Sequence, residues 1–327
     1  DGSRIQVQFT LRVGDQPFAD GRSLSVLAQS SQLTTLTDQQ LISNDVATIA
    51  SIAEPVLAIE HGVVSTTHGT VTGTPTSTVT WNPPNTGGVP FNGPVTLLSD
   101  IEGRVDGIDA GDILRLATAI ENTGGGGAFD VVTSITLPAG VSFLNGSLGA
   151  ANLSIHRGDG TLLVQGTDYS VSGNTITFLD ANGQATLLAG RANSANDNSG
   201  ANMVVITYDV VANQTIEASR TLQSTATLSN YASVNGGADF TPTDLTNTAD
   251  QQVAAPFVEK KYADGTLDDN DSSAGHTTGS DLVIGESMLY DIVVTLTEGV
   301  TPSLVLTDLI PAGLRLDMSF GGGAGYQ

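Results

Sequence analysis

The chain has 327 residues, no cysteine, and a formal net charge of −23 that arises from 34 acidic and 11 basic residues. These numbers exclude disulfide scaffolds and thiolate metal sites, disfavour nucleic acid and anionic membranes as partners, and fit an acidic extracellular protein. Glycine is abundant with 38 residues and charged residues reach only 14%, which favours many short strands and tight turns, and no run of about 18 apolar residues predicts a membrane span.

The first predicted element is residues 5–13, IQVQFTLRV, whose alternating apolar residues are typical of a strand. This segment resembles residues 203–211, MVVITYDVV, which we expect to form a buried central strand. Downstream, GRSLSVLAQSSQL resembles SRTLQSTATLSNY, with Arg22 and Arg220 198 residues apart. Residues 1–53 are therefore predicted to be the C-terminal part of a β-sandwich repeat.

The sequence indicates the secondary structure of two segments only weakly. Residues 43–53, SNDVATIASIA, are the only predicted candidate for a helix, and strand or loop is equally compatible with them. Residues 195–200, ANDNSG, are predicted to be a loop.

The second predicted unit is a complete β-sandwich repeat over residues 54–254. Its opening segment AEPVLAIEH resembles AAPFVEKKY, with Pro55 and Pro256 201 residues apart. A Thr/Pro/Gly-rich insertion is expected at 62–98, as an extended segment or edge hairpin anchored by Trp81. We favour a packing role for Trp81, and a sugar-stacking platform is the weaker alternative.

Two acidic segments could bind calcium, because Ca²⁺ takes six to eight oxygen ligands. The stronger candidate lies in ADGTLDDNDSS, and a solvated acidic loop is its alternative. The weaker candidate lies in DGIDAGD, where Gly-Asp turns offer another explanation. The stronger set is Asp264, Asp268, Asp269 and Asp271, and the weaker set is Asp106, Asp109 and Asp112.

A Pro-Ala-Gly corner occurs twice, in SITLPAGVSFLNG and in TDLIPAGLRLDMSF. Pro138 and Pro311 lack an N–H group and are predicted to end a strand ladder. Gly140 and Gly313 can adopt positive φ and turn the chain, after which a strand resumes.

Other motifs have structural explanations. The Ser-Gly-Asn turn of DYSVSGNTITFL predicts a hairpin at 169–178, and Arg157-Gly158-Asp159 is better explained as a turn than as an integrin-type motif. The histidines are isolated, and no nucleophile motif or phosphate loop is present. No enzymatic activity is therefore expected.

The third predicted unit, residues 255–327, is the N-terminal part of another repeat, with a period of roughly 200 residues. Because a half sandwich exposes strand edges and apolar faces, we expect both flanking parts to be completed by more of the same polypeptide or by a neighbouring subunit.

The order of these motifs resembles the conserved Ig-like repeats of large bacterial surface proteins. Each unit opens with a Pro-led strand; a Gly-Asp/Glu turn, an Asn-Thr-Gly strand end, a Leu-Pro-x-Gly corner, a hairpin and an ITYDV strand then follow. The pattern is also similar to fimbrial domains that form Lys–Asn isopeptide bonds. The resemblance implies all-β tandem Ig-like sandwiches, with partial domains at both chain ends, on the extracellular bacterial cell surface.

The isopeptide chemistry does not carry over to the complete unit, since no lysine lies among residues 58–61. Lys260 and Lys261 occupy the matching place in the third unit, and we interpret them as ordinary surface charge.

Two functional hypotheses follow. The first is a structural segment of a long surface protein (stalk, filament, layer or adhesin), rigidified by calcium and contacting neighbouring copies or adjacent repeats. The alternative is a module that binds cell-surface carbohydrate or a host surface through its loops.

Overall fold

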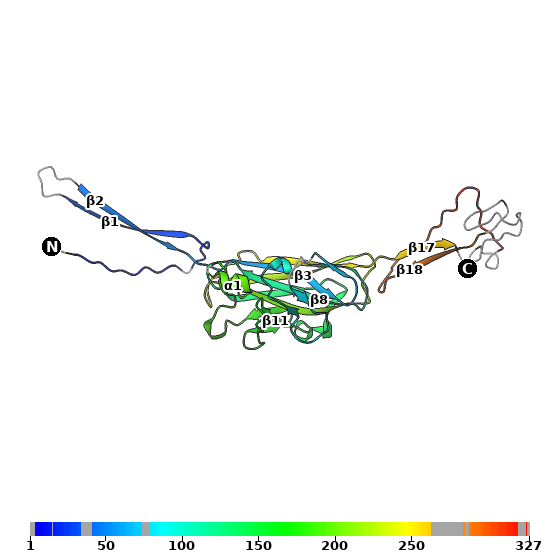
Figure 1. The fold of residues 1–327 in the computed structure, drawn as a ribbon, viewed down its shortest axis with the longest axis horizontal. Coiled ribbons are helices and arrows are strands. Elements are labelled where there is room, and N and C mark those ends of the chain that lie inside the picture. Colours follow the sequence, from blue (N-terminus) through cyan, green and yellow to red (C-terminus); the bar gives the residue numbers. More distant parts are fainter. Residues whose placement is uncertain are drawn as a thin grey trace.

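In the computed structural model of the chain, the described residues are 4–14, 16–33, 41–73, 79–101, 103–191, 193–262, 284, 288–319 and 325. Figure 1 shows a central β-sandwich with a long hairpin extending beyond each of its two ends. We call residues 4–51 the N-terminal flank and residues 257–319 the C-terminal flank, each taken over its described residues. None of the helices in the described part has the length and apolarity that crossing a bilayer requires.

Two sheets form the central sandwich. The smaller sheet has the order β10 (Val141–Phe143), β14 (Met203–Ala212), β8 (Ile113–Asn122) and β3 (Leu57–Thr66), with β11 (Ser154–Arg157) also paired to β14. The larger sheet has the order β12 (Tyr169–Ser172), β13 (Thr175–Phe178), β9 (Phe129–Thr136), β15 (Thr221–Ala232), β16 (Leu245–Val253), β7 (Arg104–Ile108) and β4 (Thr70–Thr72). All pairs are antiparallel except β16 with β7. The all-β fold class is confirmed.

The hydrophobic core lies between the two sheets and is densest along β14 and β8. Successive side chains of a strand point to opposite faces, and one face of β14 contributes Val204, Ile206, Tyr208 and Val210 to this core. Met203 and Val205 on the opposite face join a second cluster with Phe91, Val95 and Ile101 from the chain between β3 and β7. Because β14 is covered on both faces, its nearly continuous apolar sequence is confirmed as that of a buried central strand.

The segment between β3 and β7 consists of short elements joined by turns and loops. It contains β4, β5 (Thr80–Trp81), β6 (Phe91–Asn92) and the 3-10 turn η1 (Leu98–Asp100). β5 pairs with β6, so the predicted hairpin is present. Three further 3-10 turns lie at η2 (Leu144–Gly146), η3 (Leu148–Ala150) and η4 (Ala181–Gly183).

Both Pro-Ala-Gly corners form the same turn. The Val141 amide donates to the Pro138 carbonyl over 3.2 Å, and the Leu314 amide donates to the Pro311 carbonyl over 3.2 Å. Gly140 has φ +89° and Gly313 has φ +100°, a region that disfavours side chains. The predicted turn is confirmed at both sites. The strand expected after it is present at the first corner as β10, whereas residues 314–319 after the second corner form no strand.

Three local predictions are resolved. The segment with open secondary structure is a strand, β2 (Leu41–Ser51), because it pairs along its full length with β1 (Ser23–Leu33). The predicted loop at 195–200 is wrong, because α1 (Ser194–Ser199) is a short helix. The Asn193 side chain accepts a hydrogen bond from the Ala195 amide, and Gly200 ends the helix in a left-handed conformation. The hairpin of β12 and β13 is confirmed.

The N-terminal flank repeats a hairpin of the sandwich in the same register. Ser23 pairs with Ser51 in the β1–β2 hairpin, and Thr221 pairs with Gln252 in the β15–β16 hairpin. The shifts, 198 for the first strand and 201 for the second, equal those that separate the matching Arg and Pro residues in the sequence. In the C-terminal flank, β17 (Phe257–Tyr262) pairs with β18 (Tyr290–Thr295) as β3 pairs with β8.

Candidate functional site

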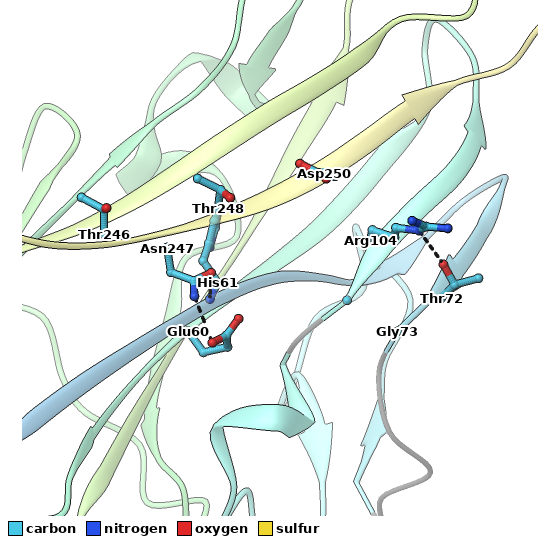
Figure 2. Close-up of a pocket in the computed structure, with 10 residues that line it drawn as sticks. Glu60, His61, Thr72, Gly73, Arg104, Thr246, Asn247, Thr248 and Asp250 are labelled. Carbon is cyan, nitrogen blue, oxygen red and sulfur yellow. Dashed lines mark hydrogen bonds between the residues drawn. The ribbon is translucent and has the colours of Figure 1, made fainter.

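A groove of about 770 Å³ lies where strands β3 and β16 of opposite sheets face each other. Figure 2 shows its two walls, with Glu60 and His61 on one side and Asn247 and Asp250 on the other. The remaining lining residues are Thr72, Gly73, Gly103, Arg104, Thr246 and Thr248.

Asn247 connects the first strand of the sandwich to its last strand. Its side-chain amide donates to the Glu60 carboxylate over 3.0 Å, and its carbonyl oxygen accepts from the His61 amide over 3.2 Å. β3 contains no lysine that could form an isopeptide bond with Asn247. The two sheets are therefore joined here by hydrogen bonds.

His61 is buried beneath the groove and is held in a fixed orientation. Its Nδ1 lies 3.1 Å from the Ala117 carbonyl oxygen and 2.9 Å from the Thr118 hydroxyl. Its ring also stacks on Tyr208 at 6.3 Å. Burial lowers the pKa of His61 to about 4, opposed by the hydrogen bond to Ala117, so the imidazole is neutral at pH 7. The position suits packing more than acid–base chemistry.

The weaker calcium candidates do not share one set of partners. Asp112 lies 2.6 Å from Nδ1 of His68 and accepts from the Asp109 amide over 2.7 Å. Asp106 instead accepts from the Thr72 hydroxyl over 3.3 Å. Burial, together with the charges of Asp112 and Glu298, raises the pKa of Asp109.

Over the described residues, no three His, Asp or Glu side chains are arranged to hold a metal ion. The stronger candidates, Asp264, Asp268, Asp269 and Asp271, lie outside the described residues. Calcium binding therefore stays a prediction.

Trp81 points toward the protein. Its ring lies 5.4 Å from that of Phe91, which meets the ring of His156 edge-on at 5.7 Å. Trp81 is partly buried and packs against the second core cluster. These contacts give it the packing role that the sequence favoured, and sugar binding by Trp81 stays a prediction.

A buried ion pair beneath the insertion was missed by sequence reasoning. Arg115 of β8 and Asp209 of β14 pair directly across the sheet, with Nε–Oδ1 and Nη2–Oδ2 distances of 2.9 and 3.1 Å. The second carboxylate oxygen also accepts from the Asn85 amide over 2.7 Å, which fixes the insertion on the sheet. The available signal was a single charged residue within each of two otherwise apolar strand centres.

The Arg157-Gly158-Asp159 tripeptide is part of a packed turn. Arg157 donates to the Thr186 and Ala201 carbonyls, and Asp159 accepts from the Thr161 amide over 2.9 Å. This agrees with the interpretation of the tripeptide as a turn.

The junction between the N-terminal flank and the sandwich is fixed by Asp20. Its carboxylate accepts from the Glu54 amide over 2.9 Å and from the Gly125 amide over 3.2 Å. Arg191 binds both carboxylate oxygens, at 2.6 and 2.7 Å. The hydrogen bond with Arg191 is the largest cause that lowers the pKa of Asp20 to about 2.

The junction with the C-terminal flank uses the matching elements of the next unit. The Val300 amide donates to the Ile216 carbonyl over 2.8 Å, and the Ala218 amide donates to the Val300 carbonyl over 3.3 Å. A shift of 173 residues, that of the two corners, places Glu298 where Gly125 stands in the sandwich. At each junction, the loop before the second-last strand of one unit (β1 or β15) contacts the segment after the second long strand of the next unit (β8 or β18).

Comparison with known proteins gives structural similarity only. No family model matches the chain, and no curated protein matches it. The pilus backbone protein RrgB from Streptococcus pneumoniae is 20% identical with a TM-score of 0.28, over 38% of this chain and 43% of that chain. The T6 backbone pilin of serotype M6 Streptococcus pyogenes is 13% identical with a TM-score of 0.31, over 72% of this chain and 43% of that chain.

ACE19, the collagen-binding subdomain of the Enterococcus faecalis surface protein ACE, is 11% identical with a TM-score of 0.25, over 43% of this chain and 87% of that chain. The structural neighbours are thus pilus backbone proteins and a surface adhesin domain, and the match spans less than half of each pilin named. Similarity at these TM-scores does not tell what the chain does, and its fold class follows from its own sheets.

Proposed function

We propose that this chain is a structural, load-bearing segment of an extracellular bacterial surface fibre built from tandem Ig-like sandwiches. The observation that carries the proposal is the repeat of the β15–β16 hairpin as β1–β2, in the same register, outside the sandwich. A repeated module arranged in series spans distance, which is the task of a fibre or stalk.

The direction in which the chain passes through the sandwich supports this proposal. The chain enters β3 at the end next to the N-terminal flank and leaves β16 at the end next to the C-terminal flank (Figure 1). A pulling force along the molecule would therefore act across the whole length of both strands. Ladder hydrogen bonds and the core must break together under such a load, which makes the module resistant.

Fixed junctions add a second support. Asp20 accepts hydrogen bonds from the sandwich backbone and from Arg191, and Val300 makes two backbone hydrogen bonds with the loop before β15. Contacts of this kind limit hinge motion between neighbouring units, so the array would be stiff without a bound ion. Calcium at the predicted acidic loop would add to this stiffness.

Immunogold electron microscopy on cells that produce the protein tests the proposal. Fab fragments raised against the sandwich should label structures that project from the cell surface. Labelling confined to the cytoplasm would contradict the proposal. Fab fragments against an abundant cytoplasmic protein provide the control for cell leakage.

A further inference from the structure

Both flanks carry apolar faces that no described residue covers. Alternate residues of the extended segment 4–14 are apolar and at least half exposed: Ile5, Val7, Phe9, Leu11 and Val13. The C-terminal flank likewise exposes Leu304, Leu306, Leu314, Leu316 and Met318. Apolar faces of this extent in a soluble protein mark a surface that another element covers.

The N-terminal flank matches the last three strands of the sandwich. β1 and β2 repeat β15 and β16 in register. The segment before β1 occupies the chain position of β14, whose core face holds Ile206, Tyr208 and Val210. Aligning Phe9 with Tyr208 puts the apolar side chains on the core face, whereas a one-residue slip would turn them outward. This alignment is one residue from the sequence parallel, and the loop before β1 absorbs the difference.

The C-terminal flank matches the strands that the N-terminal flank lacks. β17 and β18 repeat the pairing of β3 and β8. Residues 302–309 precede the second Pro-Ala-Gly corner as β9 precedes the first, and residues 314–316 follow it as β10 does. Within the two sheets of the sandwich, the strands with no counterpart among the described residues of either flank lie at or next to sheet edges: β4, β7, β11, β12 and β13.

We propose that residues 4–51 of one copy dock onto residues 257–319 of a second copy and complete a sandwich built like the central one. This deepens the proposed function, because it names the partner of each fibre segment. The two surfaces in this contact are different and lie at opposite ends of the elongated chain (Figure 1), so the association would extend head to tail into a filament. The added strands would bind by β-augmentation, with main-chain hydrogen bonds and alternating side-chain pockets.

The central sandwich supplies the expected contacts of the junction. Ala212 lies opposite Val141, and Val210 lies opposite Phe143. The corresponding pairs between copies are Val13 with Leu314 and Leu11 with Leu316. Crosslinking between these pairs would test the register of the contact between copies.

Tyr208 identifies the position with the largest expected effect. It stacks on His61 at 6.3 Å and meets Phe143 edge-on at 5.8 Å. The corresponding side chains in the junction are Phe9 of one copy, and Tyr262 and Leu316 of the other. Phe9 is therefore expected to insert between them and to act as the anchor of the contact.

Sedimentation of the full chain at rising concentration tests the proposal. The unmodified chain and the Gln8→Asp variant should form oligomers of increasing length. Phe9→Asp, which places a charge on the core-facing side of the same strand, should weaken association at least tenfold. A chain that stays monomeric at high concentration, or Phe9→Asp oligomers equal to those of the unmodified chain, would overturn it.

Cysteine pairing tests the register, and the absence of native cysteine makes the readout clean. A mixture of the Val13→Cys and Leu314→Cys variants should form a mixed disulfide on oxidation. The control mixture of Gln6→Cys with Leu314→Cys should form far less of it. Dominant pairing of Val13→Cys with itself would indicate a two-fold contact and would contradict the head-to-tail arrangement. Failure here would leave the surface labelling of the fibre proposal unaffected, so the two outcomes are distinguishable.

Discussion

Arg115 and Asp209 form an ion pair in the centre of the smaller sheet, with both side chains no more than 3% exposed. The pair lies on the face of the sheet that the insertion covers, and it accepts or donates hydrogen bonds with the backbone of that insertion. Removing one partner would leave the other charge buried and unpaired.

Arg115→Ala is therefore expected to lower the free energy of unfolding by about 3–5 kcal/mol. Denaturant unfolding measures this change. Arg115→Met combined with Asp209→Leu should recover most of the loss, because both charges are then gone. Arg104→Ala, at an exposed arginine, is the matched control and should change stability by less than about 1 kcal/mol. Equal losses of stability in Arg115→Ala and Arg104→Ala would disprove the role assigned to the buried pair.

His61 should make the sandwich sensitive to moderate acid. Its pKa is about 4 in the folded chain and about 6.5 when unfolded, so the folded state resists protonation. The stability is fully present above pH 6.5 and is lost progressively as pH falls toward 4. A loss on the order of 3 kcal/mol is expected between pH 7 and pH 4 from this residue. His61→Asn should flatten the pH profile relative to the unmodified chain, as measured by denaturant unfolding; an unchanged profile would contradict the assignment.

Asp20 should hold the first junction down to strongly acidic pH. Since its pKa is lowered to about 2, its contribution is present above its unfolded pKa, about 3.8, and is lost as pH falls through about 2. Small-angle scattering should give an unchanged distance distribution between pH 7 and pH 4. Asp20→Asn should instead broaden the distribution at neutral pH, with the sandwich still folded. A variant that scatters like the unmodified chain would show that this carboxylate does not fix the junction.

Gly140→Ala should destabilise the sandwich by about 1–3 kcal/mol. Gly140 has φ +89°, and an added Cβ would lie 2.8 Å from Cγ2 of Ile216. Gly149→Ala is the control, because a Cβ there meets nothing within 4 Å. Thermal melts of both variants distinguish a corner that requires glycine from one that tolerates any residue.

Calcium addition tests the acidic segment at 264–271. If that segment binds Ca²⁺, the melting temperature of the full chain should rise with calcium and fall back with chelator. The combined change of Asp268 and Asp269 to Asn should remove the response. Changing Asp106 to Asn separates the weaker set from the stronger one. A melting temperature that changes neither with calcium nor with chelator would contradict calcium binding.

The sequence predicted the features that depend on local pattern. Strand alternation, both corners and the turn at Ser172 to Asn174 depend on a few adjacent residues, and the sandwich contains these features. The strand predicted at residues 5–13 is wrong for the isolated chain, because that segment has no strand partner to pair with among the described residues. The repeat shifts of 198 and 201 agree with the observed register of β1 with β2, although the sequence left the secondary structure of residues 43–53 open.

Features that depend on contacts between distant residues were not predicted. Arg115 meets Asp209 across 94 positions and Asp20 meets Arg191 across 171, and neither distance has a signature in local sequence. The helix at Ser194–Ser199 was also missed. It is only six residues long and polar, so no apolar periodicity marked it.

Pulling the chain from both ends in a force spectrometer tests the central claim, that residues 54–254 form one load-bearing module between two partial ones. The claim predicts a single main rupture that lengthens the chain by about 60–70 nm, the extended length of roughly 200 residues less the folded span. Several small ruptures, or one step of about 110 nm for the whole chain, would contradict it.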